Sequence, residues 1–197
     1  MDAITTLRDD HKRVEKLFKE FERLEKNDGS AEQKKRVVDE IVRELSVHAA
    51  IEEQHFYPAV KSQVEEAEDT VLEGLEEHHV VKWTLSELDG MTGDEERFDA
   101  KVTVLIESMR HHVEEEEGEM FPKVREAIGR KELQELGQTM EKARGAAPTK
   151  PHPKAPDEPP ANLVTGPGAG LMDRTKDAAT GKTGLLGRRR EKEGSRR

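Results

Sequence analysis

Two stretches of the chain repeat one arrangement of histidine, glutamate and proline. Residues 48–58 read HAAIEEQHFYP, and residues 112–122 read HVEEEEGEMFP. In both stretches the histidine stands ten residues before the proline, and a glutamate stands six residues before it. Because the glutamate follows the histidine by four residues, a helix would carry both side chains on one face, one turn apart. A metal ion can bind between an imidazole and a carboxylate placed in this way.

Apolar residues around these stretches recur every three or four positions, and the alternation typical of strands is absent from residues 1–145. Ser30 and Gln33 form the pattern of a capping box at the start of the second helix. We predict an all-α fold, an antiparallel up-down-up-down four-helix bundle over residues 1–145, with a short fifth helix around Leu133, Leu136 and Met140. The stripes are Ile4, Leu7, Val14, Phe18 and Phe21 in residues 2–26; Val38, Ile41, Leu45, Phe56 and Ala59 after Ser30; Val71, Leu75, Val81, Leu85 and Leu88 in residues 70–88; and Phe98, Val102, Leu105 and Met109 from about Asp94.

A histidine interrupts the apolar stripe of each predicted helix, and glutamates continue two of the stripes. All these polar residues would face the bundle axis, where an unpaired ionised group costs several kcal/mol. A divalent metal ion would satisfy them, since it takes imidazole and carboxylate ligands. A lone histidine on an apolar face is usually a hydrogen-bonded core residue, but its occurrence on all four helices favours a dinuclear metal site with open positions. The candidate ligands are His11, His48, Glu52, His78, His112 and Glu116.

The remaining histidines have less support as ligands. His79 is expected to lean toward Trp83, and His111 to lie on the surface or behind a metal ligand. His55 lies one turn past Glu52 and is a candidate auxiliary ligand or a neighbour of a ligand. Tyr57 is a candidate hydrogen-bond or redox neighbour of the site, although packing beside Pro58 is the favoured role. Pro58 and its counterpart Pro122 are expected to break or kink their helices.

The composition excludes several classes of protein. The chain of 197 residues has no Cys, which excludes disulfides, thiolate metal sites and Fe–S clusters. It has no apolar run of membrane-spanning length and no recognisable secretory signal, so we expect a cytoplasmic protein without a membrane segment. The excess of acidic over basic residues in the first 145 positions speaks against nucleic-acid binding by the folded part.

Residues 146–197 differ in composition from the rest. They hold seven of the nine prolines, and 11 Lys and Arg against 6 Asp and Glu. Residues 146–160 read as an extended, polyproline-like linker. We expect a second region here, a Pro/Gly-rich, basic, disordered tail that is a candidate contact for a protein partner.

The order His11, His48-x-x-x-Glu52, His78, His112-x-x-x-Glu116, followed by FYP and MFP, resembles the hemerythrin-like (HHE cation-binding) family over about residues 3–127. The resemblance implies a non-haem di-iron centre with two iron ions, oxo- or hydroxo-bridged. It also implies that the two glutamates bridge the irons and that the four histidines are terminal ligands. Oxygen-carrying members have a further histidine one turn before the third-helix ligand, where this chain has Gly74. The difference speaks against a carrier-type coordination shell and leaves a position that His55 or water could fill.

Three functions fit this pattern. The preferred one is a di-iron protein that binds O2 or reacts with peroxide or NO; an open iron favours such chemistry, and catalase-like turnover would make the protein an enzyme. The second is an iron or oxygen sensor, or an interaction protein, in which the bundle is a metal-dependent switch. The third is a structural bundle with zinc or no metal.

Overall fold

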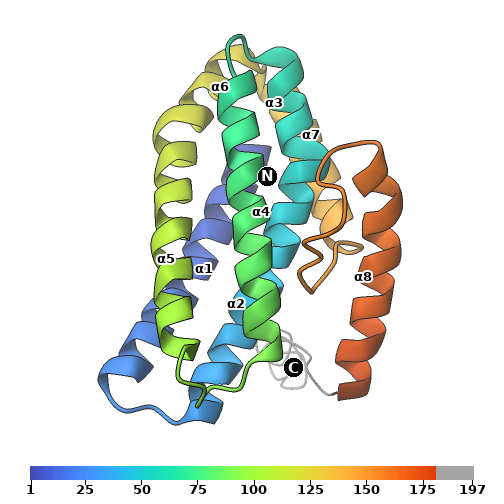
Figure 1. Ribbon diagram of the computed structural model, residues 1–197. Coiled ribbons are helices and arrows are strands. Elements are labelled where there is room, and N and C mark those ends of the chain that lie inside the picture. Colours follow the sequence, from blue (N-terminus) through green and yellow to red (C-terminus); the bar gives the residue numbers. More distant parts are fainter. Residues whose placement is uncertain (181–197) are drawn as a thin grey trace, which may run out of the picture.

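Four long helices lie side by side and form the body of the molecule (Figure 1). The structure is a computed structural model that describes residues 1–180, and all regular structure in these residues is helical. The four helices are α1 (Ala3–Lys26), α2 (Ala31–Ile51), α4 (Glu68–Gly90) and α5 (Phe98–Glu115). The expectation of an all-α fold is therefore confirmed. None of the described helices is long and apolar enough to cross a membrane.

Local sequence signals set where α1 and α2 begin. The side chain of Asp2 accepts a hydrogen bond from the backbone N–H of Thr5. Ser30 and Gln33 make the predicted capping box at the start of α2, with both reciprocal bonds present. In α4 and α5 the predicted ends were less accurate, because α4 extends to Gly90 and α5 begins only at Phe98. The residues between them form turns, and no side chain caps the first turn of either helix.

A π-helical turn follows both α2 and α5. The turns are η1 (Glu52–Phe56) and η2 (Glu116–Met120), and the chain continues as helices α3 (Tyr57–Gln63) and α6 (Phe121–Ala127). In each turn the backbone N–H of the residue before the proline bonds to the carbonyl of the candidate ligand, Glu52 or Glu116, five residues back. The chain thus stays helical past each proline, and the local disturbance takes the form of a π-helical turn directly before it. The wider turn also shifts the buried stripe by one residue, so that Val60 is buried where Ala59 was expected.

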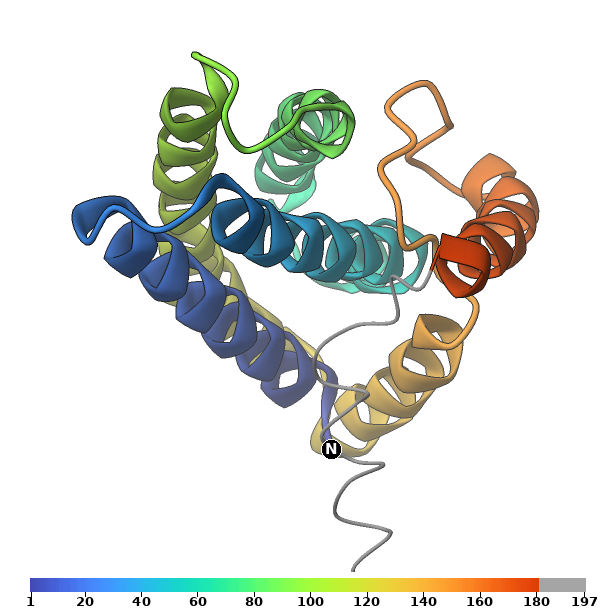
Figure 2. The same cartoon turned by 90° about the horizontal axis from the view of Figure 1, so that it is seen from below.

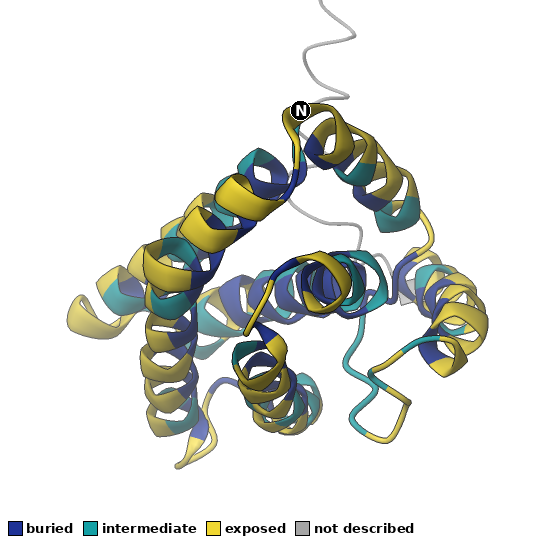
Figure 3. Cartoon of the chain, turned by 90° about the horizontal axis from the view of Figure 1, so that it is seen from above, coloured by how far each residue is buried: buried dark blue, intermediate teal, exposed yellow. Residues whose placement is uncertain are grey.

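The apolar core is divided into two clusters along the helices. In α1, Leu7 belongs to the first cluster and Val14 to the second, and His11 lies between them. In α4, Leu75 and Val81 are divided in the same way by His78. Figure 3 shows the buried residues on the inward faces of the long helices. One polar layer thus crosses a core that is otherwise packed with apolar side chains.

Two further helices pack outside the four. Helix α7 (Arg130–Arg144) is the predicted fifth helix and lies against α1 and α2, while α8 (Ala161–Thr180) lies beside η1 (Figure 2). Gly137 of α7 meets the backbone of Met1 to Ala3 so closely that an added Cβ would be 2.7 Å away. The backbone of the first three residues therefore packs directly against α7 at Gly137.

The expectation of a disordered tail over residues 146–197 is wrong for Ala161–Thr180, which form α8. Residues 181–197 lie outside the described residues. The buried face of α8 carries small and polar residues instead of an apolar stripe, which explains why the pattern of large apolar residues gave no signal. Asp173 accepts hydrogen bonds from the backbone N–H groups of Thr149 and Lys150, and Thr149 also donates to Asp177. The face comprises Asn162, Gly166, Gly170, Asp173 and Asp177.

The replacement Gly170→Ala is expected to loosen α8. The new Cβ would lie 2.1 Å from the carbonyl oxygen of Ala146, which is backbone and cannot rotate away. Hydrogen exchange of the amides in 161–180 should become faster while the rest of the chain keeps its protection. The matched control is Gly168→Ala, because a Cβ there meets nothing within 4 Å. Equal exchange in the two variants would contradict the docked position of α8.

Candidate metal centre

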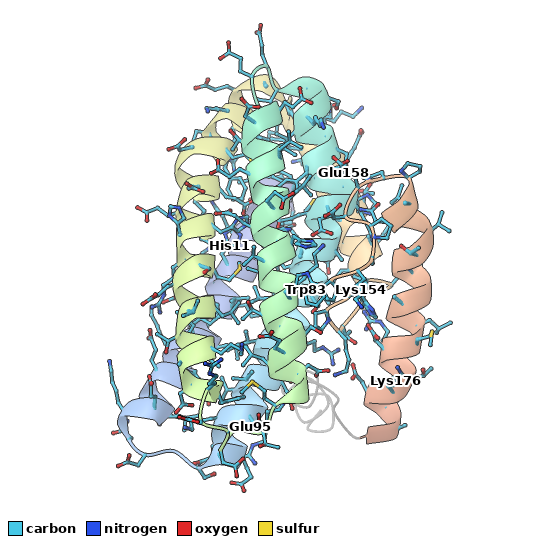
Figure 4. The ribbon with its side chains drawn as sticks, in the orientation of Figure 1. His11, Trp83, Glu95, Lys154, Glu158 and Lys176 are labelled. Atoms are coloured by element: carbon cyan, nitrogen blue, oxygen red, sulfur yellow. The ribbon has the colours of Figure 1, made fainter. Side chains whose placement is uncertain are left out.

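The structure brings all six candidate ligands into the polar layer. His11, His48, His78 and His112 come from α1, α2, α4 and α5, while Glu52 and Glu116 come from the π-helical turns. Each of the six is at most 6% exposed. Figure 4 shows His11 near mid-height of the long helices. Each glutamate lies one α-helical turn past its histidine, as the spacing predicted, and the π-helical turn begins at that glutamate.

The Nε2 atoms and carboxylate oxygens of these residues converge. Glu52 Oε2 lies 3.0 Å from His48 Nε2 and 3.5 Å from His78 Nε2. Glu116 Oε2 lies 3.3 Å from His11 Nε2 and 3.7 Å from His112 Nε2. The potential ligand atoms form two overlapping groups, each with its atoms within 4.8 Å of one another. The groups are His48, Glu52, His78 and His112, and His11, His48, Glu52 and Glu116.

Several of these atoms have no hydrogen-bond partner among the described residues, although they are buried. They include Nε2 of His11 and of His48, both carboxylate oxygens of Glu52, and Oε2 of Glu116. A buried polar atom without a partner costs about 1–3 kcal/mol, and more when it is charged. Neutral imidazoles and carboxylates are the donors that first-row divalent metals take, so the donor set fits a metal ion.

A carboxylate stands behind each of the four histidines, on the Nδ1 side. Glu77 Oε2 lies 2.6 Å from His112 Nδ1, Glu117 Oε1 lies 2.9 Å from His11 Nδ1, and Glu53 Oε1 lies 3.2 Å from His78 Nδ1. Asp10 Oδ2 is farther from His48 Nδ1, at 3.8 Å, which is an ion-pair distance and too long for a hydrogen bond. A carboxylate at Nδ1 directs Nε2 of the same ring toward a metal and raises its basicity.

These four outer carboxylates connect the helices in a closed ring. Each is the chain neighbour of a candidate ligand, yet each contacts the histidine of another helix. Asp10 of α1 faces α2, Glu53 of η1 faces α4, Glu77 of α4 faces α5, and Glu117 of η2 faces α1. Each of the four histidines is thus oriented by a carboxylate that stands next to a candidate ligand elsewhere in the chain.

Basic side chains balance three of the outer carboxylates. Lys82 Nζ donates to both oxygens of Glu53, at 2.9 and 3.1 Å. Asp10 pairs with Arg13 and Arg144, and Glu117 pairs with Arg8. Among the described residues Glu77 pairs only with His112. Glu77 is therefore the outer carboxylate that no Lys or Arg side chain balances among the described residues, and its ion-pair partner is His112.

Burial and neighbouring charges shift the pKa values of the centre. Burial lowers the pKa of His48, but the charges of Glu52 and Asp10 outweigh it, so that this pKa is raised. The pKa of His112 is raised in the same way, because Glu116 and Glu77 outweigh the effect of burial. Burial, together with the charge of His112, lowers the pKa of His78 to about 3. Burial raises the pKa of Glu116, but the charges of His112 and His11 outweigh it and hold that pKa well below its usual range. The carboxylates thus favour positive charge at His48 and His112, in the place that a metal cation would take.

Tyr57 occupies the space beside Gly74. A Cβ on Gly74 would lie 3.0 Å from the hydroxyl oxygen of Tyr57, which leaves room for no larger side chain. The hydroxyl donates to Glu116 Oε1 at 3.1 Å and lies 3.4 Å from His78 Nε2. Tyr57 is fully buried, and burial followed by the charge of Glu116 raises its pKa well above the ordinary value. Of the two roles considered for Tyr57, the structure therefore supports the hydrogen-bond neighbour of the centre, which was the less favoured one.

The other histidines lie outside the two buried groups of converging atoms, although His111 forms a third, more exposed group with Glu77 and Glu115. His79 accepts a hydrogen bond from Trp83 Nε1 at 3.1 Å, and His111 is 65% exposed beside Glu115. His55 is half-buried and forms no part of the groups, so the expectation that it is an auxiliary ligand has no support from its position. His152, in the expected tail, lies 3.0 Å from Asp173.

Comparison with known proteins gives one consistent result. Residues 2–124 match the family model of the hemerythrin HHE cation binding domain. Over 140 residues the chain is 29% identical to an uncharacterized hemerythrin-like protein of Schizosaccharomyces pombe, covering 71% of this chain and 69% of that protein. The crystal structure of a hemerythrin HHE cation binding domain-containing protein from Mycobacterium kansasii is similar with a TM-score of 0.61 and 25% identity, covering 73% of this chain and 85% of that one.

Proposed function

Because the chain belongs to the hemerythrin family of HHE cation-binding domains, we propose that its polar layer binds two iron ions and that the centre takes O2, peroxide or NO as its small ligand. The observation that carries this proposal is the set of buried, unpartnered donor atoms on His11, His48, Glu52 and Glu116. The four long helices would then serve as an up-down-up-down bundle around the irons, in a cytoplasmic protein.

The residues have distinct roles in this proposal. His11, His48, His78 and His112 would hold the irons through Nε2, and the outer carboxylates would orient the rings. Glu52 would help to hold the irons from between His48 and His78, and Glu116 from between His11 and His112. Bound iron would supply the electrons that O2, peroxide or NO chemistry requires. The two apolar clusters border the layer on both sides.

Iron content and absorption of the purified protein test the proposal together. We expect two irons per chain by elemental analysis, with near-ultraviolet absorption from ferric iron in air. Turnover of hydrogen peroxide would distinguish an enzyme from a carrier. Iron-free, colourless protein that also takes up no added Fe²⁺ would contradict the proposal, and stoichiometric zinc would favour a structural role.

Replacement of Tyr57 by Phe is expected to alter the centre without unfolding the protein. The aromatic ring keeps its packing, while the carboxylate of Glu116 loses the hydrogen bond from the Tyr57 hydroxyl. A hydrogen bond to a charged group is worth about 1.5–3 kcal/mol. We expect full iron loading with a changed absorption spectrum and a changed rate of reaction with peroxide. Among the described residues, the Tyr57 hydroxyl has polar contacts with Glu116 and His78 alone, so an unchanged spectrum and rate would show that it has no part in the chemistry.

A sensor function has one observation in its favour. Asn162 of α8 donates to the backbone carbonyl of Glu53 at 3.3 Å, and Gln54 donates to the carbonyl of Asn162 at 3.3 Å. The π-helical turn that carries Glu52 is thereby tied to α8. If the protein is a sensor, hydrogen exchange in α8 should differ between the iron-loaded and iron-free chains; equal exchange would favour the preferred function.

A further inference from the structure

A cavity of ≈ 410 Å³ opens between α1 and α5 and ends at the centre. Its inner end is formed by His11 and His48, and its mouth by charged side chains of α1 and α5. Between them the wall is apolar and comes from α1, α2 and α5: Val14, Phe18, Leu45, Met109 and Val113. We call this space the α1–α5 cavity.

The α1–α5 cavity is far larger than the small ligands of the proposed function require. One water molecule takes roughly 30 Å³ in the liquid, and O2, NO and hydrogen peroxide are of similar size. At that volume for each non-hydrogen atom, the cavity would accommodate about ten to fifteen atoms. Its volume also lies within the range of roughly 300–1,000 Å³ that is typical of pockets for organic ligands.

The walls and the mouth select against charged molecules. Arg110 is held by Glu15 through two hydrogen bonds of 3.1 Å and by Glu22 through one of 2.8 Å. Lys12 pairs with Asp9, and the carboxylates of Glu114 and Glu117 also line the cavity. The basic groups at the mouth are thus already engaged, and the apolar wall would not compensate an ion for lost hydration.

A second, smaller opening reaches the centre from another side. It measures ≈ 60 Å³ and is lined by Glu73, Glu77, Glu115 and Glu119, together with His112 and Glu116. Its size excludes an organic molecule, and its carboxylates contrast with the apolar wall of the α1–α5 cavity. The apolar lining is therefore specific to the side of His11 and His48.

We propose that the α1–α5 cavity binds a neutral, apolar organic molecule of about ten to fifteen non-hydrogen atoms beside His11 and His48. Binding itself needs only the folded chain. The position of the molecule beside a metal rests on the proposed function.

Benzotrifluoride, a neutral aromatic compound, is a suitable probe. Its ¹⁹F-NMR signal is titrated with the full-length, metal-free protein, and saturable binding is expected. Val113→Trp should fill the cavity and weaken binding at least tenfold, and Val113→Phe provides a smaller filling side chain if the tryptophan variant does not fold. Val104→Trp is the matched control, because Val104 lies on the same helix, is 59% exposed and does not line the cavity.

Non-saturable binding, or equal affinity in the filled and control variants, would overturn the proposal. Protein loaded with paramagnetic Co²⁺ then tests the position of the probe. Strong broadening of the ¹⁹F signal of bound probe is expected, and sharp lines in protein that has taken up Co²⁺ would refute the site beside the two histidines. Failure to take up Co²⁺ would instead count against the metal centre, while binding to the metal-free chain would still support the cavity.

Discussion

The double variant His48→Ala/Glu52→Ala loses the stabilisation that metal gives to the wild-type protein. An ion present at 1,000 times its dissociation constant stabilises the native state by about 4.1 kcal/mol. For a chain of this size that corresponds to a rise in Tm of about 8–16 °C. Both converging groups of ligand atoms contain His48 and Glu52, so their removal disables both. Thermal unfolding with and without added metal, together with elemental analysis, measures the effect.

The chain provides a matched control for this experiment. His111 and Glu115 have the same spacing on α5, but they are 65% and 38% exposed. In His111→Ala/Glu115→Ala the rise in Tm with metal should remain within a few degrees of the wild type. A core variant that still shows the full metal-dependent rise would place the binding site elsewhere.

Glu77→Ala weakens metal binding roughly 10- to 100-fold, the usual cost of removing a carboxylate that orients a metal-binding histidine. Glu77 lies 2.6 Å from His112 Nδ1 and is 27% exposed, so its truncation leaves no large cavity in the core. Without it, Nε2 of His112 is less basic and the ring is no longer fixed. Affinity is measured by competition with a chelator of known strength.

The conservative variant separates orientation from stability. Glu77→Gln keeps an oxygen that can accept from His112 Nδ1, and it should restore part of the lost affinity. Glu76→Ala, a change of the exposed neighbour, should leave the affinity unchanged. If Glu76→Ala and Glu77→Ala weakened binding equally, general surface charge would be the cause, and the orienting role of Glu77 would be disproved.

The ring of outer carboxylates has a consequence for assembly of the centre. Each of Asp10, Glu53, Glu77 and Glu117 contacts a histidine on another helix. An imidazole therefore reaches its final orientation only when two helices have packed. Metal binding and packing of the helices are thus expected to be coupled, since the unfolded chain has no such preformed site.

Much of the centre was predictable because it depends on helical periodicity. His11, His48, His78 and His112 each interrupt an apolar stripe, and a residue on such a stripe faces the core wherever the helix packs. The sequence offered contact with the centre only as the less favoured of two roles for Tyr57. Its position depends on η1, a π-helical turn that follows from the geometry before Pro58, and on the absence of a side chain at Gly74.

Helix α8 shows where the pattern of apolar residues fails to predict a helix. Its buried face contains Gly166 and Gly170, which allow close contact with Gln54 and the backbone of Ala146, and it needs no apolar stripe. A helix that docks on an existing body can use small and polar residues. Composition therefore suggested disorder where the structure has a helix.

The sequence alone determined that the protein is helical and which six polar side chains face the core, since both follow from spacing within single helices. Only the tertiary structure decided which carboxylate stands behind which histidine, where Tyr57 reaches, and that an apolar cavity opens between α1 and α5. Those features join residues that are 21 to 106 positions apart in the chain. Contacts of that kind depend on how helices pack against one another, and no local period encodes them.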